Sequence, residues 1–302
     1  MRDRGPEARL HSKYVTGNLK RGCMNRKLCE EKKDMYEIWF ARAEGDIYRC
    51  RLLKGCLHME EKISDDELVP AEHAVVISED PETLKMFKNK GYCCIGYTAG
   101  RDAFFEGAEC VITDFEHVSE DLIRREYDHH FGIPHVIAET ERLRIRESTE
   151  EDYPAINEMI RENEGASVSF FSQGDSLSRE EYLDYISITY SFFEYGNWSV
   201  LEKETGEIAG WCGLNPVREP SGGDMIILHC QDAESDEESS RDEGVELGYV
   251  IRRDKRKRGY ALEACTAILQ YARQELGITK FCVQVSAGNE SSLRLARKLG
   301  FQ

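Results

Sequence analysis

The chain has 302 residues, 40% of them hydrophobic, which is enough apolar material for one large or two ordinary folded domains. Its 57 acidic and 40 basic residues give a formal net charge of −17. This charge argues against a general nucleic-acid binder, whose affinity depends on neutralising phosphates. Residues 139–302 carry most of the excess, with 31 acidic and 19 basic residues, and favour a cationic partner.

No apolar run approaches the roughly 20 residues of a membrane span, and the first twenty residues lack the apolar stretch of a signal peptide. The eleven cysteines include no C-x-x-C pair, and several lie in apolar runs, as buried reduced thiols do: Cys93, Cys94, Cys212 and Cys282. We therefore expect a cytoplasmic protein that does not act at a membrane.

One cluster of potential metal ligands occurs, and it comprises Asp128, His129, His130 and His135. A surface segment between two domains explains this cluster as well as a metal site does. We expect no metal.

Residues 1–33 are polar and show no sustained periodicity, which predicts a disordered arm or upstream translation ahead of a start at Met24. Two short strands are expected over residues 36–43 and 46–53, around the Glu44-Gly45 turn.

A buried strand at residues 74–77 is followed by a helix that starts near Pro81 and ends at Gly91. Short strands are then predicted at residues 92–97 and 110–113. This order indicates a parallel sheet flanked by helices, a partial Rossmann-like α/β half-domain over residues 34–133.

Residues 73–133, from the Val76-Ile77-Ser78-Glu79-Asp80-Pro81 run to Val111-Ile112-Thr113-Asp114-Phe115, resemble the C-terminal half of haloacid-dehalogenase-like hydrolases. The resemblance implies that Glu79 and Asp80 correspond to the acids that hold Mg²⁺ in that family. No Asp-x-Asp precedes Asp80, so the nucleophile is missing. We expect a structural or ligand-sensing remnant, with a phosphatase as a remote alternative.

After a helix at residues 118–130, residues 134–140 are expected to be a linker and residues 141–302 a second domain. Leu143 and Ile145 alternate with arginines, as in a strand with one wet face. Capping boxes at Ser148-x-x-Glu151 and Ser178-x-x-Glu181 start two helices.

A hairpin over residues 198–202 and 208–214 is expected to turn at Thr205-Gly206. Residues 231–244 form an acidic insert, which is either a solvated loop or an attractor for a cationic substrate.

Residues 245–251 predict a strand, and residues 252–258 hold six basic residues and Asp254. Gly259-Tyr260-Ala261 follows, then a helix from Leu262 to about Leu276. A loop at a helix N-terminus offers unpaired N–H groups and the positive end of the helix dipole. Gly259 would let a diphosphate approach the backbone, so we expect an anion site here.

The sequence from Arg256 to Ala261, Arg-Lys-Arg-Gly-Tyr-Ala, fits the Arg/Gln-x-x-Gly-x-Gly/Ala signature of the GCN5-related N-acetyltransferase (GNAT) superfamily. Further matches occur at Glu141–Arg146, Glu246–Tyr249, Asn289-x-x-Ser292 and Leu299-Gly300-Phe301. Residues 139–302 resemble the branch that includes the bacterial ribosomal-protein N-terminal acetyltransferases.

This resemblance implies a mixed sheet flanked by helices and acetyl transfer from acetyl-CoA to a primary amine, without a metal. It implies that the backbone of Arg256, Lys257, Arg258, Gly259, Tyr260 and Ala261 holds the pyrophosphate. Tyr249, Val250 and Ile251 would pair with pantetheine, and Asn289 and Ser292 would lie at the CoA arm.

Glu246, early on the strand that feeds the loop, is the candidate general base, although a surface Glu beside the acidic insert is the alternative. Many family members place a tyrosine seven residues after the asparagine as general acid, but this chain has Ala296 there. Tyr249, Tyr260 or water would then serve, or the thiolate would leave unassisted.

The resemblance leaves the acceptor open: a peptide N-terminus, a polyamine, an aminoglycoside or another small amine. A homodimer is possible, and a CoA-binding regulator without turnover is the alternative function. The sequence stops at Phe301-Gln302, where the GNAT fold begins its last two strands. We therefore expect a truncated protein with an unpaired sheet edge beside Phe281–Val285, weak activity and a tendency to associate.

Overall fold

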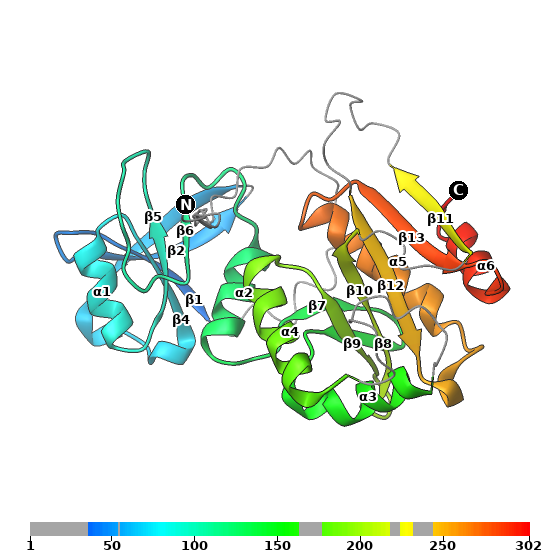
Figure 1. Ribbon diagram of the computed structural model, residues 1–302. Helices are drawn as coiled ribbons and strands as arrows, with labels where there is room; N and C mark the ends of the chain where they lie inside the picture. The colour runs from blue at the N-terminus through cyan, green and yellow to red at the C-terminus, as the bar shows by residue number, and fades with distance from the viewer. Residues whose placement is uncertain (1–35, 54, 163–176, 218–223, 232–243) are drawn as a thin grey trace, which may run out of the picture. The chain divides into compact units, whose positions relative to one another are not determined.

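The computed structural model describes residues 36–53, 55–162, 177–217, 224–231 and 244–302 (Figure 1). The chain divides into two compact units, residues 1–133 and residues 134–302, and each has its own sheet flanked by helices. The expected arm, the candidate start at Met24 and almost all of the acidic insert lie outside the described residues.

The first unit contains a six-stranded sheet. Four of its strands run parallel in the order β1 (Glu37–Ala41), β4 (Ala74–Ser78), β5 (Cys93–Tyr97) and β6 (Cys110–Ile112). β2 (Ile47–Leu53) and β3 (Cys56–Ile63) extend it beside β1 as an antiparallel meander. β3 was not predicted from the sequence, because only Ile63 of its eight residues is buried and no apolar alternation marks it.

Two helices cover opposite faces of this sheet. Val76 packs with Leu84 and Phe87 of α1 (Pro81–Asn89), whereas the adjacent Val75 packs with residues of α2 (Glu120–His130). Neighbouring strand residues point to opposite faces, so both faces of β4 are buried. The predicted parallel, helix-flanked sheet is confirmed, and its element ends differ by only a few residues.

The two acids that resemble metal ligands have protein partners. Asp80 caps α1 by accepting a hydrogen bond from the Thr83 backbone nitrogen at 2.8 Å. Arg101 Nη2 donates to Glu79 Oε2, also at 2.8 Å. Both carboxylates therefore serve the local structure of this unit.

The expected surface cluster around Asp128 is not a surface segment throughout. Asp128 is buried and pairs with Arg124 at 2.9 Å, and His135 of the second unit is buried as well. Among the described residues no group of three or more His, Cys, Asp or Glu side chains could hold a metal ion. The four cysteines expected to be buried thiols are buried and free.

The second unit contains a seven-stranded sheet. Its order is β11 (Met225–Gln231), β13 (Lys280–Ser286), β12 (Val245–Ile251), β10 (Ile208–Pro216), β9 (Asn197–Glu202), β8 (Leu143–Arg146) and β7 (Val136–Glu139). Among the described strands of this sheet, only β12 and β13 are parallel neighbours. The mixed, helix-flanked sheet expected here is confirmed. The segment 134–140 differs from the expected linker, because β7 lies within it and pairs with β8.

The predicted unpaired edge beside Phe281–Val285 is wrong. β11 pairs antiparallel with β13 along its whole length, from Met225 opposite Ser286 to Gln231 opposite Lys280. Gln302 in turn exchanges two backbone hydrogen bonds of 3.0 Å with His229 of β11. No element was expected over residues 225–231, so the partner strand was not foreseen.

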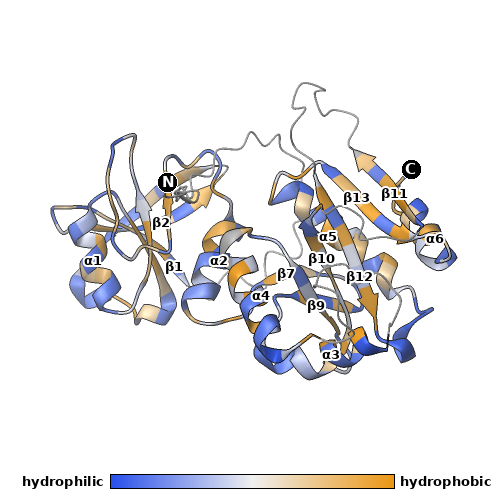
Figure 2. Ribbon diagram, viewed as in Figure 1, coloured by the Kyte–Doolittle hydropathy of each residue, from blue (hydrophilic) through white to orange (hydrophobic). Residues whose placement is uncertain are grey.

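In the described part of this unit, four α-helices lie on the two faces of the sheet (Figure 1): α3 (Tyr153–Arg161), α4 (Arg179–Phe192), α5 (Tyr260–Gln274) and α6 (Glu290–Lys298). Trp211 packs in the cluster of α3 and α4, and the adjacent Cys212 packs in the cluster of α5 and α6. In Figure 2 the strands contain long hydrophobic stretches, whereas the loop after β12 is hydrophilic. No helix in the described ranges is long and apolar enough to cross a membrane.

One of the two predicted capping boxes is confirmed and one is displaced by a residue. Ser178 and Glu181 cap α4 as expected. Before α3, Thr149 and Asp152 form the box instead of Ser148 and Glu151. Arg146 holds Asp152 through contacts of 2.6 and 2.9 Å, which favours this register.

Candidate functional site

β12 and β13 separate after two residue pairs. β12 pairs with β10 over all seven residues, but with β13 only at Val245–Phe281 and Glu246–Cys282. Beyond that point no strand in the described part of the chain pairs with residues 247–251 on the β13 side. We call this gap the strand opening. Its backbone donors and acceptors are available to an extended ligand.

The side chains of β12 alternate between the two faces of the sheet. Val250 packs with α3 and α4, whereas Leu247 and Tyr249 pack with α5 and α6. By the same alternation Glu246 faces the α3 and α4 side. Glu246 is only 4% exposed and lies at the last pair before the strand opening. Burial, together with the nearby Glu246 charge, raises the pKa of Cys282 to about 11.

The basic loop, residues 252–259, joins β12 to α5. Lys257 (φ +61°) and Gly259 (φ +87°) both have left-handed backbone, with Arg258 between them. Such alternation turns successive N–H groups toward one side and forms an anion-binding concavity. α5 begins at the next residue, Tyr260, so the free N–H groups of its first turn adjoin the same place.

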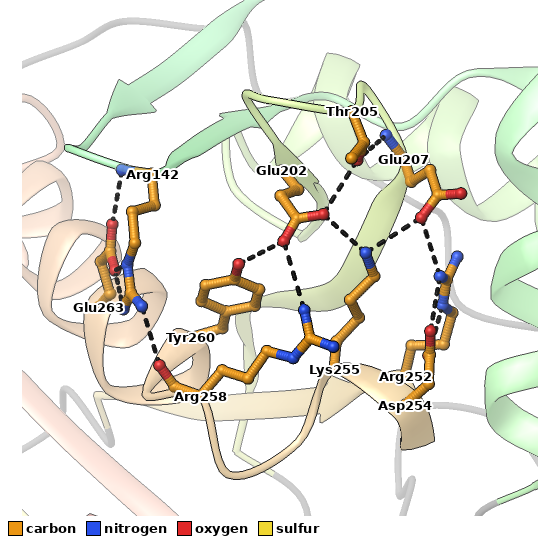
Figure 3. A network of polar contacts seen from close by, with 10 residues as sticks. All are labelled: Arg142, Glu202, Thr205, Glu207, Arg252, Asp254, Lys255, Arg258, Tyr260 and Glu263. Carbon is orange, nitrogen blue, oxygen red and sulfur yellow. Dashed lines mark hydrogen bonds and ion pairs between the residues drawn. The ribbon is translucent and has the colours of Figure 1, made fainter.

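Part of the positive charge in the basic loop is used internally (Figure 3). Lys255 is buried, and its Nζ lies 2.6 Å from Glu202 Oε2 and 3.0 Å from Glu207 Oε2. Arg252 pairs with Glu207 at 3.0 Å and with Asp254 at 2.7 Å. The exposed cations of the loop are Arg253, Arg256, Lys257 and Arg258.

The Glu202 carboxylate accepts hydrogen bonds from several side chains. Besides Lys255, it accepts hydrogen bonds from the Tyr260 hydroxyl and from Thr205 Oγ1, the latter at 3.0 Å. Lys255 and then Tyr260 lower the pKa of Glu202 to about 2, and the same carboxylate raises the pKa of Tyr260. The Tyr260 hydroxyl is thus directed at Glu202, which makes it a poor candidate for the general acid.

Arg142 attaches the end of the basic loop to the start of β8. Its Nη1 donates to the Arg258 carbonyl at 2.9 Å, and its Nε donates to Glu263 Oε2 at 2.8 Å. The guanidinium also lies 4.7 Å from the centre of the Tyr260 ring. Burial would raise the pKa of Glu263, but hydrogen bonds from Thr140 and Arg142 outweigh it and lower that pKa.

Tyr249 and α6 meet on the α5 and α6 face. The Tyr249 hydroxyl is buried and has no hydrogen-bond partner of ordinary geometry among the residues that the structure describes. Burial raises the pKa of Tyr249 to about 12, although the Ser292 hydroxyl is close enough to act in the opposite direction. Asn289 caps α6, its Oδ1 accepting from the Ser292 backbone nitrogen at 3.1 Å. The structure therefore brings Tyr249 and Ser292 together, beside Asn289.

A buried polar cluster on the Glu246 face was not predicted from the sequence. Asn215 of β10 is the direct cross-strand partner of Glu246, and its amide Nδ2 donates to Asn197 Oδ1 at 3.3 Å. Tyr185 of α4 donates its hydroxyl hydrogen to Asn215 Oδ1 at 3.2 Å. Asn197 and Asn215 directly flank the two predicted hairpin strands, and the structure includes them in β9 and β10, where a buried amide requires partners.

Residues 142–302 match the family model of the GNAT acetyltransferase domain, and the chain belongs to this family. This match does not extend to residues 73–133, and their resemblance to haloacid-dehalogenase-like hydrolases is not supported. Acetyltransferases of the GNAT family take their acetyl group from acetyl-CoA.

Two curated relatives come from Bacillus subtilis. The uncharacterised protein YkkB is 23% identical over 161 residues, covering 53% of this chain and 82% of its own. The uncharacterised N-acetyltransferase YoaA is 23% identical over 169 residues, covering 55% and 82%. A solved structure from Vibrio cholerae, assigned as a ribosomal-protein-serine acetyltransferase, is 21% identical with a TM-score of 0.38, covering 54% of this chain and 80% of its own.

Proposed function

We propose that the chain transfers the acetyl group of acetyl-CoA to a primary amine, either a protein N-terminus or a small amine. The observation that carries this proposal is the strand opening, which leads from the buried Glu246 to the left-handed backbone at Lys257 and Gly259. An extended thioester arm with a diphosphate at its far end suits such a path.

In this proposal the coenzyme is held mainly by backbone. The N–H groups from Arg256 to Ala261, with the positive end of the α5 dipole, bind the pyrophosphate. The free edge of Tyr249, Val250 and Ile251 pairs with the pantetheine amides. Asn289 and Ser292 border this path from the start of α6.

Acetyl transfer then needs one proton acceptor on the Glu246 face. The neutral amine attacks the thioester carbonyl carbon, the new C–N bond forms, and the C–S bond breaks. Glu246 takes the proton that the amine loses, directly or through water. Backbone N–H groups of β12 that face the strand opening stabilise the negative charge on the carbonyl oxygen. An α-amine, with a pKa of about 7.7–8.0, is more easily neutral than a lysine at about 10.4.

The leaving thiolate has a candidate hydrogen-bond donor in Tyr249. Its pKa of about 12 keeps the hydroxyl protonated at neutral pH, so it stabilises the thiolate without ionising. Ala296, which stands where many relatives have a tyrosine, is buried and offers no hydroxyl. Tyr249 therefore takes over the role of stabilising the thiolate, which solvent finally protonates.

The proposal is tested by measuring acetyl-CoA consumption with peptides of free N-terminus, polyamines, aminoglycosides and other small amines. Turnover with at least one amine, lost in Glu246→Gln, supports it. The absence of a tyrosine at Ala296 favours the second candidate, a CoA-binding regulator. Calorimetric binding of CoA with no turnover in the whole panel would establish that candidate instead.

A further inference from the structure

Glu202 connects the β9–β10 turn to both ends of the segment 255–260. It is the last residue of β9, and its side chain is 8% exposed. Its carboxylate meets Lys255 at the start of the segment and Tyr260 at its end, and Arg258 Nη1 lies 3.8 Å away (Figure 3). A single carboxylate thus contacts three residues of the region proposed to bind the diphosphate.

The surroundings of Lys255 indicate that its charge pairs with carboxylates of the protein. Its side chain is 8% exposed, and its ammonium contacts only the two carboxylates of Glu202 and Glu207 among the ion pairs of the described residues. Glu207 is itself 51% exposed, so Glu202 is the buried partner. Removing the charge of Glu202 would leave a buried ammonium with one solvated partner, which is strongly unfavourable.

The loop backbone that these contacts hold is not a relaxed one. Lys257 has left-handed φ although it is not a glycine, and such a residue persists only where its surroundings fix it. Glu202 holds Lys255 and Tyr260, which flank Lys257 and Gly259 in the sequence. Without that carboxylate, Lys257 can relax to negative φ and the row of N–H groups is lost.

We propose that Glu202 is the positioning residue of the basic loop: through Lys255 and Tyr260 it fixes the backbone that receives the diphosphate, and Lys255 is its counter-ion rather than a phosphate ligand. This inference rests on the proposed binding of CoA at the loop. It assigns control of coenzyme affinity to a residue on a different strand, 53 residues before Lys255.

The test compares Glu202→Gln with Glu204→Gln in the full chain. Glu204 is an exposed carboxylate of the same turn and serves as the matched control. For Glu202→Gln we expect the calorimetric Kd of CoA and the KM of acetyl-CoA to rise by about tenfold or more, with the KM of the amine unchanged. For Glu204→Gln we expect wild-type values. A Kd within about twofold of wild type for Glu202→Gln would overturn the proposal.

A double variant separates positioning from simple loss of folding. Glu202→Gln with Lys255→Met removes both buried charges, so we expect it to regain wild-type stability in denaturant unfolding while its Kd for CoA stays raised, because the contacts that fix the loop backbone are still absent. Lys257→Met provides the contrast with Lys255, because Lys257 is an exposed cation. We expect this variant to bind CoA more weakly and its Kd for CoA to depend less on salt concentration. A double variant that regains wild-type affinity for CoA would show that the unpaired ammonium, and not the missing carboxylate contacts, weakens binding in Glu202→Gln, and would overturn the positioning role. Failure of the wild-type chain to bind CoA would instead refute the proposed function.

Discussion

At position 259 the backbone conformation restricts the choice of residue. The left-handed φ of +87° is strained for any residue with a Cβ, and most strained for a β-branched one. A Cβ there would approach only the flexible end of Arg142, at 3.4 Å, so the conformation decides the outcome rather than space. We expect Gly259→Val to shift the loop and weaken CoA binding by more than about tenfold in calorimetry.

The control for this variant is Gly45→Val in the first unit. Gly45 has nearly the same φ, +85°, and a Cβ added there would meet nothing within 4 Å, so the variant carries equal strain in the unit to which no part of the coenzyme site is assigned. It should destabilise the first unit and leave the Kd of CoA unchanged. Near-wild-type affinity in Gly259→Val would refute the assignment of residues 256–261 to the pyrophosphate.

Glu246 is the residue on which the chemical step is proposed to depend. Replacing it by glutamine removes the proton acceptor but keeps its size and its place between Asn215 and Cys282. We expect kcat to fall by roughly 10²–10⁴-fold while the Kd of CoA changes little. The measurement is kcat across the neutral pH range, and a rate equal to wild type throughout that range would remove Glu246 from the mechanism.

The basic loop shows which part of a site can be predicted from sequence. The strand, the loop and the start of α5 are successive in the chain, so local rules of helix termini and glycine conformation were sufficient. The pairing of Lys255 with Glu202 joins residues far apart in sequence, and a run of basic residues gives no sign of it. The sequence does not separate Lys255 from the other basic residues of 252–258, whereas the structure has it buried.

At the scale of elements, the Glu202 contacts predict how the loop responds to acid. The usual pKa of 4.5 is lowered to about 2 in the folded chain, chiefly by Lys255. A lowered pKa contributes stability that is complete above the unfolded value of 4.5 and is lost as the pH falls toward about 2. We expect CoA protection of the loop against proteolysis to decline over this window. Glu202→Gln should remove that part of the pH dependence, and an identical acid profile in the variant would contradict this.

The two neighbouring acids at the start of α1 contribute differently to the stability of the first unit. Asp80 caps the helix, and loss of a cap costs about 0.5–2 kcal/mol, whereas the exposed Glu79–Arg101 pair is worth little. Denaturant unfolding should show Asp80→Ala to be clearly less stable than wild type and Glu79→Gln nearly unchanged. Equal effects of the two variants would refute the capping role.

Strands that were predicted and strands that were missed differ in how local their signal is. β4 and β5 are buried on both faces and consist of nearly continuous apolar runs, and β12 is buried on both faces as well, with Glu246 among its apolar residues. β3 is almost wholly exposed, and β7 has only four residues. β11 pairs with β13, whose residues lie roughly fifty positions further along the chain, and no turn signal links them. Pairing of this kind is decided by tertiary structure.

At the scale of the molecule, each unit has its own core. Among the described residues, the clusters around Trp39 and Phe40 contain residues of the first unit alone, and those around Trp198 and Trp211 contain residues of the second unit alone. Cores that share no residues favour separate cooperative unfolding. The coenzyme site is proposed entirely within residues 134–302. Coenzyme binding should therefore change the unfolding temperature of the second unit and not that of the first.

We therefore expect calorimetry of the full chain to resolve two thermal unfolding transitions. CoA should raise the midpoint temperature of only one of them. A ligand at about a hundredfold excess over its Kd stabilises the unit that binds it by about 2.7 kcal/mol and leaves an independent unit unaffected. Gly259→Val should abolish the shift of that transition, and Gly45→Val should lower the other one. A single transition that CoA raises as a whole would show that the two units unfold together, and the assignment of independent cores would be wrong.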